Sequence, residues 1–180
     1  MHSTKVKDSW NQQFTPACEL YSPYRIRAAF DEWSTLNPQP IMVTLTYDQD
    51  RAAGQLICSA RTDTAYRAMQ AHFGLFHHLL NRRIFKSAYK RYRKVITMFP
   101  VVEQNQDEGR HFHIPMTKPD WLTISGLRGR VASSWKHGFA QVEVDNDGSF
   151  FNQYTQKLRS KEFNLESFAD AFLFEYWSIN

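Results

Sequence analysis

Hydrophobic residues alternate with polar ones, or gather in β-branched runs, in four short stretches that predict β-strands. Pro100 has no N–H to donate to a neighbouring strand, so the stretch that contains it predicts an edge strand or a bulge. The polar run Gln104–Gly109 predicts a hairpin loop between the second and third stretches. The four predicted strands are Ile41–Tyr47, Val95–Glu103, Arg110–Met116 and Ala140–Val144.

Other stretches repeat their hydrophobic residues at helical spacing. Asn37 and Pro38 end the first of these helices, and Gly138 ends the third. The predicted helices span residues 22–35, 63–93, 120–136, 149–159 and 163–177. Helices interspersed with strands, two of which form a hairpin, predict an α+β sandwich with an antiparallel sheet.

Length and composition indicate one globular domain over residues 1–180. Cys18 and Cys58 follow no metal-ligand spacing and make no disulfide framework, which fits a reducing compartment. No run approaches the roughly 20 apolar residues of a membrane span, and the polar segment Met1–Asn11 is unlike a signal peptide. We therefore expect a soluble cytoplasmic protein with no membrane partner.

The net charge of +4 is concentrated in one part of the chain. Between Thr64 and Val102 there is no Asp or Glu, yet the run RRIFKSAYKRYRK carries seven cations in thirteen residues. Phosphate contacts by the cations and base stacking by the interleaved Phe85, Tyr89 and Tyr92 would fit a nucleic acid. A solvated helix face is the alternative. The seven cations are Arg82, Arg83, Lys86, Lys90, Arg91, Arg93 and Lys94.

The segment His111–His113 (HFH) places two imidazoles on one face of a predicted strand. Two imidazoles on one face could provide two of the ligands of a divalent metal ion. Glu103 would stand beside His111 across the hairpin and is the preferred third ligand, whereas Asp107 and Glu108 are alternatives in the loop. Mg²⁺ or Mn²⁺ would suit such a His/His/carboxylate set. Two histidines with only a structural role are the competing interpretation.

Tyr154 and Lys157 would share one face of a predicted helix. A phenol with an ordinary pKa of about 10 is a poor nucleophile. Attack on a phosphate therefore needs a metal to make the phosphate electrophilic and a nearby cation to stabilise developing charge. An exposed Tyr and Lys on an ordinary helix are the alternative. Elsewhere, His72, His77 and His78 are interpreted as packing or DNA-proximal residues, while Thr44 and Thr46 could approach the metal site.

Taken in order, these motifs resemble those of HUH replication initiators (Reps) with a single catalytic tyrosine. The strand Val43–Tyr47 (VTLTY) resembles the first Rep motif, although it lacks the usual Phe. His111–His113 matches the motif that names the superfamily, Glu103 has the spacing of the acidic ligand in many Reps, and Tyr154–Lys157 matches Y-x-x-K. The resemblance covers about residues 41–158, leaving an N-terminal helical extension (1–40) and a C-terminal helical tail (160–180).

The resemblance implies about five antiparallel strands flanked by helices, with the metal site on the sheet and the tyrosine helix facing it. It implies that Tyr154 attacks a phosphate of single-stranded DNA or an origin hairpin, leaving a 5′-phosphotyrosine and a free 3′-OH. Such nicking and joining would initiate rolling-circle replication of a phage, plasmid or integrated element. The chain shows no phosphate-binding loop, so a separate helicase is expected. The oligomeric state stays open.

Two other functions remain open. Within the same superfamily, a transposase or a relaxase is an alternative, although relaxases usually carry their tyrosine before the histidines. From another class, a non-catalytic nucleic-acid-binding protein would bind in a way that neither metal nor Tyr154 affects.

Overall fold

The computed structural model describes residues 28, 31–33, 35–37, 40–48, 63–105 and 109–144. The chain divides into two compact units, Met1–Pro38 and Gln39–Asn180. In the first unit, residues 31–33 and 35–36 are helical, which agrees with the described part of the helix predicted over residues 22–35. Its end is marked by Asn37, whose side-chain amide donates to the carbonyl of Trp33 at 2.8 Å.

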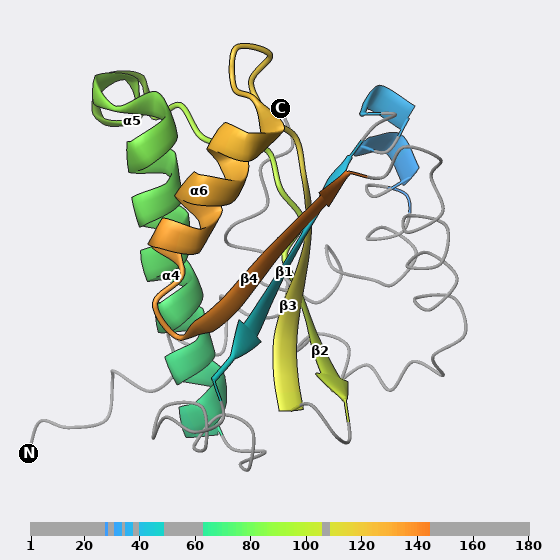
Figure 1. Ribbon diagram of the computed structural model, residues 1–180. Helices are drawn as coiled ribbons and strands as arrows, with labels where there is room; N and C mark the ends of the chain where they lie inside the picture. Colours follow the sequence, from blue (N-terminus) through green and yellow to red (C-terminus); the bar gives the residue numbers. More distant parts are fainter. Residues whose placement is uncertain are drawn as a thin grey trace, which may run out of the picture. The chain divides into compact units, whose positions relative to one another are not determined.

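The second unit contains a four-stranded antiparallel sheet in the order β2-β3-β1-β4 (Figure 1). The predicted α+β class with an antiparallel sheet is therefore confirmed. The expectation of about five strands is wrong for the residues that the structure describes, which form four. The strands are β1 (Ile41–Tyr47), β2 (Val101–Asn105), β3 (Gly109–Met116) and β4 (Gly138–Val144).

The predicted hairpin is confirmed, but its strands extend further and its loop is shorter than the predicted Gln104–Gly109. Asn105 pairs with Gly109, so the ladder continues into the run that was expected to be loop. In contrast, β2 begins at Val101 rather than Val95, because Pro100 interrupts the hydrogen-bonding ladder. Before it, only Met98 makes an isolated bridge, to Met116. As the proline suggested, β2 borders the described sheet.

The predicted helix over residues 63–93 is wrong in one respect, because it is two helices, α4 (Asp63–Phe85) and α5 (Ser87–Tyr92). Lys86 between them has φ 50° and ψ −120°, which is incompatible with a continuous helix. The chain turns there and returns toward the sheet. Buried Asn81 fixes the return, since its Oδ1 accepts from the amide of Ile96 at 2.7 Å.

One face of the sheet carries the hydrophobic core, covered by α4 and α6 (Ile124–Ser134) (Figure 1). Helix α4 supplies buried residues at helical spacing, including Met69, Phe73 and Leu80. The ring of Phe73 lies 5.2 Å from that of Phe112 in β3. Each such side chain contributes about 1.5–3 kcal/mol by leaving water. No helix in the described part of the chain has the length and apolar character needed to cross a bilayer.

Helix α6 is shorter than the predicted 120–136, because its ends are set by specific contacts. Thr123 caps the N-terminus by accepting from the amide of Gly126 at 3.1 Å. At the other end, Trp135 leaves the helix with extended backbone and its indole N–H donates to the carbonyl of Thr46 at 3.1 Å. The turn then reaches Gly138, which begins β4 rather than merely ending the helix. A Cβ there would overlap the carbonyl oxygen of Thr46, so β4 can approach β1 only with glycine at this position.

Candidate metal centre

The alternation of side chains along β3 separates the histidines from the core. Phe112 points into the helix-covered face, where it contacts Phe73 of α4. Successive strand residues point to opposite faces, so His111 and His113 both point to the face opposite α4. Glu103 of β2 pairs with His111 in register and shares that face. Strand register alone therefore brings the three predicted ligands together.

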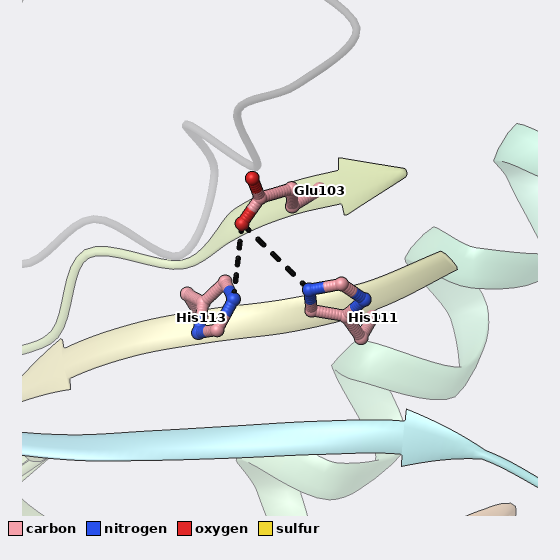
Figure 2. Close-up of side chains that lie close together, drawn as sticks. All are labelled: Glu103, His111 and His113. Atoms are coloured by element: carbon pink, nitrogen blue, oxygen red, sulfur yellow. Dashed lines mark ion pairs between the residues drawn. The ribbon is translucent and has the colours of Figure 1, made fainter. Parts of the chain in front are cut away.

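The three side chains converge closely (Figure 2). Oε2 of Glu103 lies 3.1 Å from Nε2 of His113 and 3.7 Å from Nε2 of His111. The two imidazole rings are perpendicular, with centroids 4.7 Å apart. Each residue offers one donor atom, and all three donors lie within 4.8 Å of one another. The predicted placement of Glu103 beside His111 is confirmed. The alternative third ligands, Asp107 and Glu108, lie outside the described residues.

Thr44 of β1 contacts the second nitrogen of His113. Its Oγ1 lies 3.2 Å from Nδ1, in a pair that the β1–β3 register sets directly opposite. When Nε2 carries the proton, it donates to Glu103 and the Thr44 hydroxyl donates to Nδ1. When Nε2 is deprotonated for metal binding, Nδ1–H donates to the hydroxyl instead. The hydroxyl can serve both tautomers, so it orients the ring in either state.

His111 is held differently. The residue is 4% exposed, and its Nδ1 is buried with no hydrogen-bond partner among the described residues. Its neighbour across the ladder is Thr46. The His111 Nε2 lies 3.7 Å from the Glu103 carboxylate, and the His111 ring stands perpendicular to that of His113. An imidazole whose Nε2 faces a carboxylate can give its lone pair to a cation held between the two groups.

The donor set fits one divalent ion. Metal–ligand bonds of about 2.1 Å place adjacent donors about 3 Å apart, close to the observed Glu103–His113 and Glu103–His111 separations. Two imidazoles and one carboxylate from adjacent strands are a donor set that could hold a divalent metal ion. Three protein ligands leave further positions for oxygen atoms of a phosphate or water.

The seven predicted DNA-binding cations lie at the C-terminal end of α4, in α5 and next to it, and together we call them the α5 basic surface. Six are exposed, while Arg83 is half-buried and donates to the carbonyl of Leu79 at 3.4 Å. No carboxylate of the described residues pairs with any of them. The surface consists of Arg82, Arg83, Lys86, Lys90, Arg91, Arg93 and Lys94.

The aromatic residues of this run do not all face outward, contrary to the expected stacking platform. Phe85 is 9% exposed and belongs to the core, with the Lys94 ammonium 5.6 Å from its ring centre. Tyr89 is half-buried, and its hydroxyl lies 3.1 Å from Nδ1 of His78. Only Tyr92, which is 77% exposed, could stack on a base.

The remaining histidines near the core serve packing. His72 stacks on His137 with ring centroids 3.7 Å apart. Burial, assisted by the neighbouring His78, lowers the pKa of His77 to about 4. His72 also has a lowered pKa because of burial. Packing was one of the two interpretations that the sequence left open for His72 and His77.

Tyr154 and Lys157 lie outside the described residues, as do the helices predicted over residues 149–159 and 163–177.

No protein-family model matches the chain, and no significant match was found among curated proteins or solved structures. The contact of Thr44 with His113 could not be predicted from the sequence alone. Strand alternation placed Thr44 and Thr46 on the same face, but the β1–β3 register was needed to show which of the two lies opposite His113.

Proposed function

We propose that the protein nicks and rejoins single-stranded DNA at a replication origin, with Tyr154 as nucleophile and one divalent ion held by Glu103, His111 and His113. The observation that carries the proposal is the convergence of these three side chains on the sheet face opposite the helices. The choice of Tyr154 as nucleophile comes from the order of the sequence motifs, which resembles that of HUH Reps. Rolling-circle replication of a mobile element, assisted by a separate helicase, is the corresponding biological role.

In the proposed reaction, the phenol oxygen of Tyr154 attacks the scissile phosphorus and the bond from phosphorus to the 3′ oxygen breaks. The phenol loses its proton, and the departing 3′ oxygen gains one to become a free hydroxyl. The product is a 5′-phosphotyrosine, and attack by the 3′-OH reverses the reaction. A bound ion supplies Lewis-acid activation of the phosphate. Lys157, three residues after the nucleophile in the sequence, would stabilise developing negative charge.

The test is formation of a covalent protein–DNA adduct from pooled single-stranded DNA and Mn²⁺, followed on denaturing gels. Wild type should form an adduct that a chelator prevents, and Tyr154→Phe should form none. Tyr92→Phe is the matched control, because Tyr92 is an exposed tyrosine on the α5 basic surface, and it should react like wild type.

Two outcomes would count against the proposal. An adduct that persists in Tyr154→Phe would assign the nucleophile to another residue. Tight DNA binding without any adduct across a diverse pool would instead favour the non-catalytic nucleic-acid-binding function, for which the α5 basic surface would suffice.

A further inference from the structure

The sheet face that carries the His/Glu cluster (Glu103, His111 and His113) also carries an exposed aromatic side chain, Phe139 of β4. Residues directly opposite one another in an antiparallel pair point to the same face. Thr46 of β1 lies opposite His111 of β3 on one side and opposite Phe139 on the other. Phe139 therefore shares the face of the cluster and lies in the same transverse row as His111.

Only strand β1 separates Phe139 from His111 (Figure 1). Neighbouring strands lie about 4.8 Å apart, so about 10 Å separates the two backbones. The residue between them is Thr46, whose short side chain is half-buried. This spacing is close to the span from one phosphate to the base of an adjoining nucleotide. A base could therefore reach Phe139 while a phosphate lies at the His/Glu cluster.

The position of Phe139 is one that the pattern of β4 would give to a polar residue. Its side chain is 72% exposed, whereas Val142 on the other face of the strand is buried. The next residues on the Phe139 face are the polar Gln141 and Glu143. Single exposed hydrophobic residues are common, but this one stands in the row of a candidate phosphate-activating site. Exposed aromatic rings in such a place are suited to stack on nucleobases.

Gln141 adds an oriented hydrogen-bonding group next to Phe139. It is exposed and lies opposite Thr44 on the same face. Its amide nitrogen donates to Oε1 of Glu143 at 2.6 Å. A carboxylate only accepts, so the nitrogen faces Glu143 and the amide oxygen faces the other way. That oxygen can accept from an exocyclic amino group, which adenine, cytosine and guanine have and thymine lacks.

We propose that Phe139 and Gln141 form a subsite for one nucleobase next to the phosphate that the His/Glu cluster would hold. Phe139 stacks on the base, and the amide oxygen of Gln141 accepts from its amino group, so the subsite prefers cytosine or adenine to thymine. The proposal rests on the proposed function in taking the ligand to be single-stranded DNA, and it deepens that function by naming two residues that select the base.

The test compares binding of labelled oligo(dC) and oligo(dT) of equal length by fluorescence anisotropy, in chelator, so that no catalysis is required. Phe139→Leu keeps an apolar side chain but removes the ring, and Phe139→Trp restores a ring. Gln141→Met keeps the length of the side chain but removes the acceptor. Trp121→Leu is the matched control, because Trp121 is 60% exposed and lies in the turn before α6, which covers the other face. Thermal unfolding verifies that each variant is folded.

We expect wild type to bind oligo(dC) about two- to tenfold more tightly than oligo(dT), which is the discrimination that one hydrogen bond provides. Phe139→Leu should lose at least about fivefold in affinity for both strands, because it removes the stacking interaction, and Phe139→Trp should recover it. Gln141→Met should bring the ratio of the two affinities close to one. Trp121→Leu should bind both strands as wild type does.

The subsite is overturned by unchanged affinity in Phe139→Leu, by an equal loss in Trp121→Leu, or by the absence of a preference for oligo(dC) that Gln141→Met removes. These binding results do not depend on cleavage. If no DNA yields an adduct while the variants change binding as expected, the proposed nicking fails and the subsite stands. If adducts form and Phe139→Leu binds both strands like wild type, the nicking stands and the subsite fails.

Discussion

Replacing Thr44 by valine would remove one hydroxyl next to the cluster of Glu103, His111 and His113, while keeping the β-branched shape that suits a strand. The hydroxyl lies 3.2 Å from Nδ1 of His113, so the variant loses the contact that orients this ring. Thr46 offers a matched control. It lies two residues further along the same strand and the same face, opposite His111, whose Nδ1 has no hydrogen-bond partner among the described residues.

The magnitude follows from the geometry. Partners of metal-binding histidines are typically worth 10–100-fold in metal affinity. The His113 side chain is 22% exposed, so water can replace part of the lost interaction and the lower end of that range applies. We therefore expect Thr44→Val to weaken Mn²⁺ binding about tenfold, equivalent to about 1.4 kcal/mol. Thr46→Val should change the affinity less than about twofold.

Isothermal titration of each variant with Mn²⁺ measures this difference, and thermal unfolding verifies the fold. Thr44→Ser should recover most of the wild-type affinity, because it restores the hydroxyl. Equal affinities for Thr44→Val and wild type, or equal losses for the two valine variants, would refute the assigned role of Thr44.

Three further predictions concern stability and are measured by urea unfolding. Asn81→Ala leaves the buried amide of Ile96 without its acceptor and should cost about 2–4 kcal/mol; a loss below about 1 kcal/mol would contradict this. Gly138→Ala forces a Cβ against the β1 backbone and should cost about 3 kcal/mol or more, so an unchanged midpoint would disprove the close approach. Burial holds the pKa of His77 at about 4, so below about pH 6.5 the unfolded state takes up a proton that the folded state does not. Stability should therefore fall as pH decreases from 6.5 to 4, by at most about 3 kcal/mol, and His77→Gln should lose that part of the pH dependence.

Local sequence patterns were sufficient to predict where the strands lie and that Glu103, His111 and His113 come together. The run Ile41–Tyr47 became β1 with the same bounds, since β-branched residues favour extended backbone. A short polar loop between two strands limits their register, which placed Glu103 opposite His111. The period of two along β3 then put both histidines on one face. The cluster of Glu103, His111 and His113 could be predicted because it depends on short-range strand pairing only.

The features that the sequence did not reveal depend on long-range contacts. Residues on both sides of Lys86 favour a helix, and the break follows from the need to bring Ile96 back to Asn81. The inward orientation of Phe85 and Tyr89 likewise depends on where the core lies. The exposed cations around them could be predicted from composition, but the partial loss of the stacking surface could not.

The most direct test of the proposed function is to map the residue that becomes joined to DNA. Trypsin cleaves after Lys136 and Lys157, and the peptide between these sites contains Tyr154 as its only tyrosine. After reaction of wild type with single-stranded DNA and Mn²⁺, and digestion with trypsin and nuclease, mass spectrometry should find a nucleotide on Tyr154 of this peptide. Attachment to a residue outside this peptide, such as Tyr92, or attachment that is unaffected by removing the metal, would contradict the account.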